Sequence, residues 1–303
     1  MDKTLFMFPG QGSQSVGMGR DLYEKYSVVK KVLDDFNSSL DFDLLKVMFE
    51  GPEDVLNDTR YTQPALYSLS YAIFELLKDR DIAPDFLAGH SLGEYTAVAA
   101  SGALDPVDGL LLVNERGKLM AEASSKAPGS MAAIVFKNPD EEFKVVEDVV
   151  SFLSKKGVIV VANHNGSSQV VISGQRELIA EAVELLKGKV RRVVPLAVSG
   201  AFHSPLMEPI ARQFAEVLEK TSFKDAVVPL IMDVDAEIVR SASDIKERLL
   251  KQLTSSVLWT DVLRRAYREG VKSFVEVGPG RVLQGMVAKT LSGVDIKSYQ
   301  ALL

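Results

Sequence analysis

The chain has 303 residues, of which 47% are hydrophobic and 25% are charged, and its formal net charge is −6. This composition is typical of a globular protein of about two domains, and it excludes a disordered chain, a coiled coil and a collagen-like repeat. The negative net charge argues against nucleic acid or an anionic membrane as a partner of the whole surface, and we expect neither. Cysteine is absent, so disulfides, thiolate metal sites and a cysteine nucleophile are excluded.

The N-terminal sequence predicts neither a signal peptide nor a membrane anchor. Its apolar run is Leu5 to Phe8, which Pro9 and Gly10 end, and a signal peptide needs a longer apolar region. No stretch of the sequence approaches the roughly 18 apolar residues of a membrane helix. We therefore expect a cytoplasmic protein, and the lack of cysteine is consistent with a reducing compartment.

The first part of the chain alternates short apolar segments with segments of helical periodicity. The pattern predicts two buried strands, over 4–8 and 86–88. It predicts three helices, over 64–78, 92–102 and 106–123. Pro64 is placed in the first turn of its helix, and Asp105 is the predicted N-cap of the helix that Pro106 begins.

The middle of the chain has a different organisation. Residues 124–130 are polar and contain Pro and Gly, which predicts a linker. The segments that follow have the order βαββαβ: strand 131–136, helix 139–155, strand 158–162, strand 169–173, helix 176–187 and strand 190–196. This order is that of a ferredoxin-like unit, in which the first and last strands are antiparallel neighbours. Because its two ends then lie close together, the unit can be inserted into another domain, with the return connection at 199–201.

The last part of the chain again alternates helices and strands. The predicted elements are a helix from Ser204 to about Lys220, strand 227–231, helix 244–253, helix 257–269 and strand 271–277. Short apolar strands between helices favour a mostly parallel sheet covered on both faces. We therefore predict an α/β fold with a discontinuous domain, 1–123 and 204–303, and an inserted ferredoxin-like domain at 130–198.

The strongest local signal is the pentapeptide Gly89-His90-Ser91-Leu92-Gly93, which lies between a predicted strand and a predicted helix. This G-x-S-x-G pattern in this context is typical of a nucleophile elbow, which gives the catalytic domain a hydrolase-like character. The glycines permit a very sharp turn, and the amides at the start of the helix stabilise negative charge at the serine. The alternative is an ordinary turn between a strand and a helix.

A serine nucleophile needs a base, and three histidines are available: His90, His164 and His203. His90 adjoins Ser91 and points elsewhere at an elbow, so we interpret it as a packing or hydrogen-bonding residue. His164 lies in a predicted loop of the insert and is interpreted as solvated. His203 precedes a helix N-terminus, whose dipole favours the neutral imidazole that a base requires, although a structural role is the alternative.

Two features of an α/β-hydrolase are missing. No acidic residue between Ser91 and His203 in the outer domain has a convincing position at a strand end, and the HGGG-type oxyanion motif is absent. A plain esterase is therefore a partial fit. The loop Gly10-Gln11-Gly12 is the candidate source of the second oxyanion amide.

Six motifs, in order along the chain, point to one family. From end to end the chain resembles the malonyl-CoA:acyl-carrier-protein transacylases, the acyltransferases that load fatty acid synthases, and the ferredoxin-like insert matches the small subdomain of that family. The motifs are Phe8-Pro9-Gly10-Gln11-Gly12-Ser13-Gln14, Thr62-Gln63-Pro64-Ala65-Leu66, Gly89-His90-Ser91-Leu92-Gly93-Glu94, Gly200-Ala201-Phe202-His203-Ser204, Gln252-Leu253 and Glu276-Val277-Gly278-Pro279-Gly280.

The resemblance implies a role for each of several residues. Ser91 is implied to be the acylated nucleophile and His203 its base. The main-chain carbonyl of Gln252 is implied to orient the imidazole, which explains the missing acid. Gln11 and Leu92 are implied to give main-chain amides to the oxyanion hole.

Further residues are implied to contact the substrate. Arg116 is implied to bind the free carboxylate of the malonyl group, which suits a guanidinium, although the sequence alone favours an ion pair on the helix surface with Glu115 or Glu122. Phe202 is implied to favour malonyl over methylmalonyl, a preference of about 1–3 kcal/mol. Gln63 and Asn165 complete the implied substrate-binding set.

The sequence departs from the family pattern at two places. Gly166 follows Asn165 where the family often has Ser-Pro, and Asp233 stands where the family usually has Asn. We interpret both departures as affecting local loop contacts and not the chemistry.

The implied partners are malonyl-CoA and an acidic acyl carrier protein. The candidate docking patch is basic, although it can equally be a solvated edge of the insert: Lys187, Lys189, Arg191 and Arg192. Coenzyme A and phosphopantetheine enter as substrate groups, and we expect no metal or other cofactor and a monomeric chain. Two alternatives stay open, a serine hydrolase or thioesterase on the same elbow and a non-catalytic acyl-binding scaffold.

Overall fold

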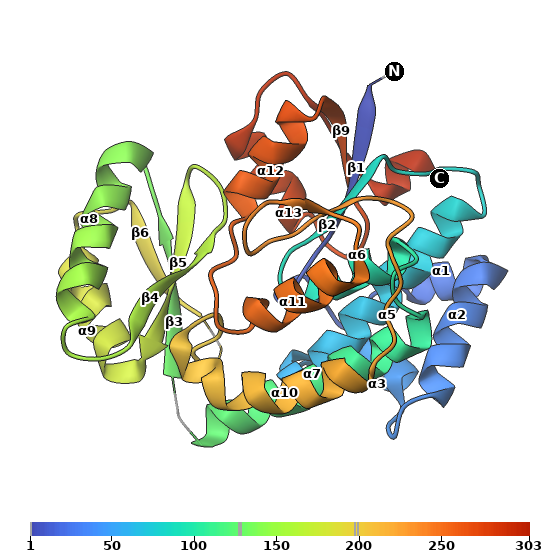
Figure 1. Cartoon of the computed structure of the whole chain (residues 1–303), viewed down its shortest axis with the longest axis horizontal. Helices are drawn as coiled ribbons and strands as arrows, with labels where there is room; N and C mark the ends of the chain where they lie inside the picture. The colour runs from blue at the N-terminus through green and yellow to red at the C-terminus, as the bar shows by residue number, and fades with distance from the viewer. Residues whose placement is uncertain (1, 127–128, 197, 199) are drawn as a thin grey trace.

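The structure, a computed structural model, describes residues 2–126, 129–196, 198 and 200–303. It contains two units side by side, each a sheet covered by helices (Figure 1). The large unit has a six-stranded sheet of order β10-β9-β1-β2-β7-β8, and the small unit has a four-stranded sheet of order β4-β5-β3-β6. No helix in the described part of the chain has the length and apolar character needed to span a membrane.

The large unit is built from both ends of the chain. Its strands are β1 (Lys3–Phe8), β2 (Phe86–Gly89), β7 (Leu230–Ile231), β8 (Ile238–Val239), β9 (Val271–Glu276) and β10 (Asp295–Ser298). Its helices in the N-terminal part are α1 (Arg20–Lys25), α2 (Ser27–Ser38), α3 (Leu44–Glu50), α4 (Glu53–Asn57), α5 (Thr59–Lys78), α6 (Leu92–Ala100) and α7 (Pro106–Lys126). Its helices in the C-terminal part are η1 (Pro205–Met207), α10 (Glu208–Lys220), α11 (Ala242–Gln252), α12 (Trp259–Arg268), α13 (Val282–Thr290) and η2 (Tyr299–Leu302).

The central strand β1 explains why helices cover both faces of the large sheet. Its side chains point alternately to opposite faces, and four consecutive residues are fully buried. Phe6 and Phe8 belong to the core formed with α5, α6 and α7. Leu5 and Met7 belong to the core formed with α12 and α13. All strand pairs of this sheet are parallel except β7 with β8, as the continuous apolar strands predict.

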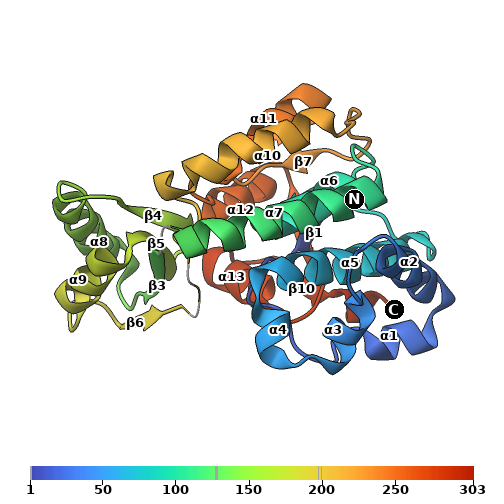
Figure 2. The same cartoon turned by 90° about the horizontal axis from the view of Figure 1, so that it is seen from below.

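The small unit has the predicted βαββαβ order. Its elements are β3 (Gly129–Val135), α8 (Pro139–Leu153), β4 (Ile159–His164), β5 (Gln169–Gln175), α9 (Arg176–Leu186) and β6 (Arg192–Pro195). The first and last strands, β3 and β6, are antiparallel neighbours as expected. Helices α8 and α9 lie on the side of the small sheet that faces away from the large unit (Figures 1 and 2).

The two connections between the units lie next to each other. A Cβ atom built on Gly129 would lie 2.5 Å from the Cβ of Ala201, so the chain enters and leaves the small unit at one place. Part of the predicted return connection, Ser199, lies outside the described residues. The strands of each sheet lie in the residue ranges expected from the sequence. That these ranges are two domains stays a prediction.

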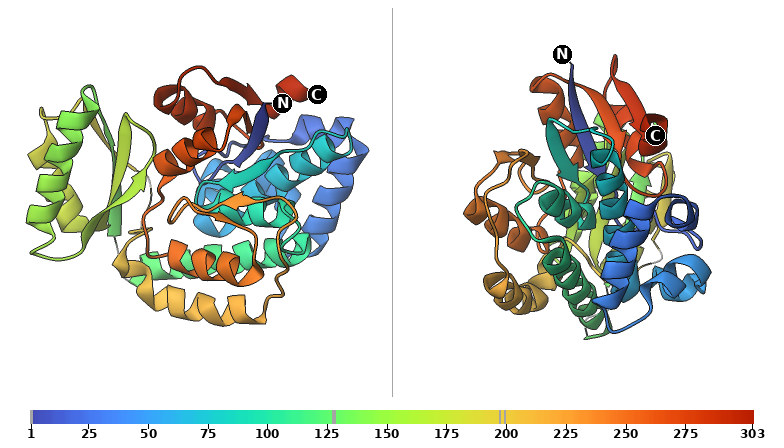
Figure 3. Two further views of the ribbon diagram at one scale, coloured as in Figure 1. Left: turned by 45° about the horizontal axis from the view of Figure 1, so that its top comes forward. Right: turned by 90° about the vertical axis from the view of Figure 1, so that its right-hand side faces the viewer.

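Main-chain hydrogen bonds dock the small unit on the large one. The amide of His164 donates to the carbonyl of Val257 (2.8 Å), and the amide of Val257 donates to the carbonyl of Ala162 (2.9 Å). The hydroxyl of Thr260, in the first turn of α12, donates to the carbonyl of His164 (3.0 Å). The end of β4 is therefore tied to the segment that leads into α12. The left view of Figure 3 shows the two units next to each other.

The structure differs from several predicted boundaries. Helix α5 begins at Thr59 because the carboxylate of Asp58 caps it, so the prediction that Pro64 lies in the first turn is wrong. Helix α7 runs to Lys126, so residues 124–126 are helical and not part of a linker. Strand β7 has two residues where 227–231 was predicted. Elements α1 to α4, β8, α13 and β10 were not predicted at all.

His164 is also placed differently from its prediction. It is the last residue of β4 and not a loop residue, and its ring makes an edge contact with Phe143. His164 is half-buried, and burial lowers its pKa. The prediction that His164 lies in a loop is therefore wrong, because pairing with β5 and the main-chain bonds to 257 extend the strand.

Candidate active site

Ser91 occupies the sharp turn between β2 and α6. Its backbone has φ 51° and ψ −107°, a strained conformation for a residue with a side chain. The flanking glycines are required by space: a Cβ on Gly89 would lie 2.0 Å from the carbonyl carbon of Gly93, and one on Gly93 would lie 2.0 Å from the carbonyl oxygen of Phe8. This geometry is that of a nucleophile elbow and not of an ordinary turn.

His203 meets Ser91 across 112 residues of sequence. Its Nε2 lies 2.8 Å from Ser91 Oγ, and its Nδ1 lies 2.9 Å from the main-chain carbonyl oxygen of Gln252. A carbonyl can only accept, so Nδ1 carries the hydrogen and Nε2 is free to accept from the serine hydroxyl. Burial, together with the positive Arg116, lowers the pKa of His203 to about 3. The imidazole is therefore neutral at neutral pH, as a general base must be.

Arg116, on α7, is 1% exposed and reaches the nucleophile. One terminal nitrogen donates to Gln63 Oε1 (2.8 Å), and the other donates to Gln252 Oε1 (2.9 Å) and to Ser91 Oγ (3.3 Å). Within the described ranges its guanidinium has no carboxylate partner. The surface ion pair with Glu115 or Glu122 is therefore not formed.

A buried cation without a counter-charge is costly, and an anion bound beside Ser91 would offset that cost. Tyr95 lies under the guanidinium, with its ring centre 5.2 Å from the Arg116 Cζ. The arrangement is chemically suited to bind a carboxylate next to the serine.

The two implied oxyanion amides lie at neighbouring strand ends. Leu92 is the first residue of α6, and Gln11 follows β1, whose last residue pairs with the last residue of β2. Neither main-chain N–H has a hydrogen-bond acceptor in the described part of the chain. The side chain of Gln11 donates to the hydroxyl of Thr59 (3.2 Å).

His90 links the elbow to the small unit. Its Nε2 lies 2.7 Å from Asn165 Oδ1, and its ring makes an edge contact with Trp259, with ring centres 5.5 Å apart. The amide nitrogen of Asn165 in turn donates to Gln169 (3.2 Å). His90 is thus a hydrogen-bonding residue, as expected. Asn165 contacts the residue that directly precedes the nucleophile.

Two fully buried acidic residues, Glu94 and Asp233, complete the site and were not predicted there. Asp233 Oδ2 accepts from the main-chain amide of Ser91 (2.9 Å), and Glu94 Oε1 accepts from the main-chain amide of Asp233 (2.6 Å). Burial raises the pKa of Asp233 to about 7 and the pKa of Glu94 well above its ordinary value. One sequence signal pointed to Asp233, because the family usually has Asn at this position. Asp233 contacts the nucleophile and does not lie in a peripheral loop.

The remaining implied residue, Phe202, precedes the base and is 7% exposed within the large core. A cleft of about 660 Å³ opens beside Gln11. Its walls come from residues 54–60, from the C-terminal half of α7 and from Val198. In the described part of the chain no group of three or more His, Asp or Glu side chains is arranged to hold a metal ion.

Comparison with known families identifies this arrangement. A family described as the acyl transferase domain matches residues 5–302. The chain belongs to the acyl transferase family. A malonyl CoA-acyl carrier protein transacylase of Bacillus subtilis (strain 168) is 43% identical over 290 residues, covering 95% of this chain and 90% of the relative.

Solved structures support the same relationship. An acyl carrier protein S-malonyltransferase from Vibrio cholerae superimposes on this acyl transferase with a TM-score of 0.91 and 36% identity, covering 98% of this chain and 96% of that one. A malonyl-transacylase in complex with its type II PKS acyl-carrier protein has a TM-score of 0.91 and 35% identity, covering 98% and 94%. The hydrolase-like core with a ferredoxin-like small unit is thus the fold of the family.

Proposed function

We propose that this acyl transferase moves the malonyl group from malonyl-CoA to the phosphopantetheine thiol of an acyl carrier protein through an acyl-Ser91 intermediate. The observation that carries the proposal is the buried Arg116, which has no carboxylate partner in the described ranges and lies 3.3 Å from Ser91 Oγ. A site for a plain acyl group has no use for such a cation, whereas a malonyl group brings a carboxylate to it. The names of the relatives agree with this substrate.

In the first half-reaction, Ser91 Oγ attacks the thioester carbon while its proton passes to His203 Nε2. The main-chain carbonyl of Gln252 holds the imidazolium that forms, through the Nδ1–H bond of 2.9 Å. The amides of Gln11 and Leu92 receive the oxyanion, and one such donor is worth roughly 10²–10³ in rate. The C–S bond then breaks, and His203 returns the proton to the leaving sulfur of coenzyme A.

In the second half-reaction, the thiol of the carrier's phosphopantetheine arm attacks the malonyl-serine ester. His203 takes the thiol proton and gives it to Ser91 Oγ as the C–O bond breaks. The malonyl thioester leaves, and the enzyme returns to its starting state. Coenzyme A and phosphopantetheine are thus substrate groups, and the proposed steps use no metal or other cofactor.

Selectivity is assigned to residues around the acyl group. Arg116, held by Gln63 and Gln252, binds the malonyl carboxylate with two parallel hydrogen bonds. Phe202 is assigned to exclude a methyl branch, and Asn165 to fix His90 behind the elbow. Phe202 fills space beside the base, so its effect is a preference of about 1–3 kcal/mol.

The cleft beside Gln11 is assigned to the pantetheine arm of either substrate. Its lining joins the oxyanion amide to the surface through residues of α5 and α7. The carrier protein is assigned to the exposed basic patch of the small unit, which consists of Lys187, Lys189, Arg191 and Arg192. We place the reaction in fatty acid synthesis in the cytoplasm, with the chain acting as a monomer.

Intact-protein mass spectrometry after mixing with malonyl-CoA tests the proposal. We expect a malonyl-sized mass increase on the unaltered protein and none on folded Ser91→Ala. No adduct on the folded, unaltered protein would contradict the proposal and favour a non-catalytic scaffold. Release of free malonate without transfer to a carrier would favour the hydrolase alternative.

A further inference from the structure

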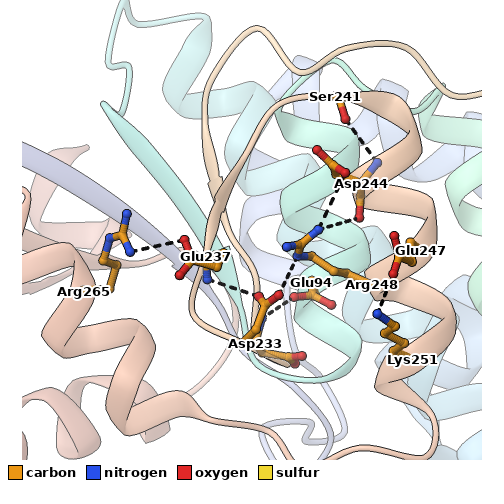
Figure 4. A network of polar contacts seen from close by, with 10 residues as sticks. Glu94, Asp233, Glu237, Ser241, Asp244, Glu247, Arg248, Lys251 and Arg265 are labelled. Atoms are coloured by element: carbon orange, nitrogen blue, oxygen red, sulfur yellow. Dashed lines mark hydrogen bonds and ion pairs between the residues drawn. The ribbon is translucent and has the colours of Figure 1, made fainter.

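Two acidic side chains lie directly behind the nucleophile, and the proposed steps do not use them. Glu94 is on α6, one turn after Ser91, and Asp233 is in the turn between β7 and β8. Both are fully buried. Figure 4 shows both residues, with the hydrogen bond between the Asp233 main-chain amide and the Glu94 carboxylate drawn.

The side-chain amide of Gln252 joins these carboxyl groups to the rest of the site. Its nitrogen donates to Glu94 Oε2 (2.6 Å), to Asp233 Oδ2 (3.2 Å) and to the main-chain oxygen of Ser91 (3.0 Å). Its oxygen accepts from Arg116. One amide therefore bridges the two carboxyl groups on one side and the proposed malonyl-binding cation on the other.

The hydrogen bonds of the two carboxyl groups are unequal. Each oxygen of Glu94 accepts one strong donor. Asp233 accepts with Oδ2 alone, and its Oδ1 is buried without a partner in the described part of the chain. Two ionised carboxylates that share one donor, without direct contact with a cation, would leave a buried negative charge uncompensated. With one proton on the pair, one buried negative charge remains in place of two.

We propose that Asp233 is a positioning residue that anchors the main chain of Ser91, and that it works as half of a carboxyl pair with Glu94 that holds one proton. This inference rests on the proposed function, because it concerns the rate at which Ser91 is acylated. Neither half of the pair touches the reacting atoms. The pair acts through the amide of Ser91 and through Gln252.

Charged and titratable groups face the pair from every side, and they support one shared proton. Burial raises the pKa of both carboxyl groups, and a neighbouring acid raises each further, whereas Arg116 and the hydrogen bonds to each carboxyl group lower it; the net direction is upward for both. The groups are Arg116 from α7, the neutral Tyr95 from α6, the neutral His203, and Asp235 of the same turn, which Arg248 of α11 binds (2.9 Å). Because the two carboxyl groups interact, their titration belongs to the pair.

Loss of the shared proton would place a second negative charge behind the elbow. That charge opposes the oxyanion that forms beside Leu92 and draws the Gln252 amide, and with it Arg116, away from the malonyl carboxylate. Acylation should therefore slow as the pH rises through the apparent pKa of the pair, near the pKa of about 7 of Asp233. Asp233→Asn keeps an acceptor for the Ser91 amide and has no proton to lose.

The test is the rate of malonyl-Ser91 formation in a single turnover, measured by mass between pH 6 and 9. In the unaltered protein we expect a fall of up to about tenfold for each pH unit above the apparent pKa. In Asp233→Asn we expect the rate at pH 6 to be kept and the fall to be absent. The matched control is Asp235→Asn, which removes a charge from the same turn and should keep the fall, moved to lower pH because Asp235 raises the pKa of Asp233.

A second variant tests the anchor itself. Asp233→Ala leaves the Ser91 amide without its acceptor, and we expect slower acylation at every pH with the KM for malonyl-CoA little changed. Asn at the same position should restore the rate, which a general loss of packing would not predict. Thermal unfolding curves establish that each variant is folded.

The same curves give a readout that is independent of activity. A folded-state pKa raised above the unfolded value gives stability that is full below about pH 4 and is lost as pH rises through about 7. The Tm of Asp233→Asn should therefore rise relative to that of the unaltered protein between pH 6 and 9. If the unaltered protein and Asp233→Asn had the same pH profiles of rate and of Tm, the inference would be overturned and the proposed function would stand. The absence of any adduct would overturn the proposed function.

Discussion

The large and small units both pack helices on a sheet, but they contribute differently to the site. The large unit supplies Ser91, Arg116, His203 and Gln252. In the described residues of the small unit, Asn165 is the side chain that hydrogen-bonds a residue of the elbow. In the mostly parallel sheet of the large unit, the carboxyl ends of the strands lie at one edge, and the N-termini of the following helices point to that edge. In the antiparallel sheet of the small unit, neighbouring strands end at opposite edges.

Backbone strain separates the units in the same way. Ser91 and His203 both have positive φ values, of 51° and 56°. Among the described residues of the small unit, positive φ values occur at glycines alone, Gly166 and Gly188. The large unit has two further non-glycine residues of positive φ, Asp81 and Ala236, so among the described residues backbone strain lies in the unit that carries Ser91 and His203.

The largest expected effect is in the large unit, at His203. His203→Ala removes the base and should slow malonyl-Ser91 formation by about 10²–10⁴-fold, because the serine proton then has no acceptor. Stopped-flow mixing with malonyl-CoA measures this rate. A loss below tenfold in a folded variant would show that another group takes the proton.

The second largest effect is expected at Arg116. Arg116→Ala should slow transfer from malonyl-CoA by about 10²-fold, because the malonyl carboxylate is left buried without its cation. Transfer from acetyl-CoA, which has no second carboxylate, should change much less. Lys126→Ala on the same helix is the matched control, since Lys126 is exposed and pairs with Glu122. Equal losses with malonyl and acetyl groups would show that Arg116 does not select the substrate.

Asn165 tests the contribution of the small unit. Asn165→Ala breaks the bond to His90, and the loss of one hydrogen bond of about 0.5–1.5 kcal/mol should slow acylation several-fold. The exposed Asn138 of the same unit makes no capping hydrogen bond, so Asn138→Ala serves as the control. A loss as large as that of His203→Ala would break the contrast between the two units.

The smallest expected effect is at the basic patch. Exchange of Lys189 and Arg191 for Glu should raise the KM for the carrier protein, more so at low salt, because exposed charges act through steering. Malonyl-Ser91 formation should stay unchanged, because coenzyme A does not use this surface in our account. Lys155→Glu, at an exposed position just after α8, is the control. An unchanged KM would show that the patch is a solvated edge of the small unit and does not bind the carrier protein.

Much of the fold could be predicted from the sequence because its signals are local. The Gly89–Gly93 pentapeptide and the alternation of β1 follow from steric and burial rules that act over short stretches. Helices α1 to α4 were not predicted. Helices α1, α3 and α4 have 5 to 7 residues and bury one or two side chains each, so their pattern is weak. Helix α2 was missed although its buried Val29, Leu33 and Phe36 have helical spacing.

The missed part of the site is non-local. Asp233 meets Ser91 across 142 residues and Glu94 meets Gln252 across 158, and no spacing rule connects such positions. The surface ion pair of Arg116 was expected because Glu115 and Glu122 are near it in the sequence. It failed because α7 turns that face inward, toward the nucleophile.

The most direct test of the account is a chase of the isolated malonyl-enzyme. After removal of malonyl-CoA, addition of a carrier protein bearing phosphopantetheine should clear the adduct from Ser91 and give the carrier an equal mass increase. The loss of mass from the enzyme and the gain of mass by the carrier should occur at the same rate. An adduct that persists, or that is lost as free malonate while the carrier keeps its mass, would contradict it.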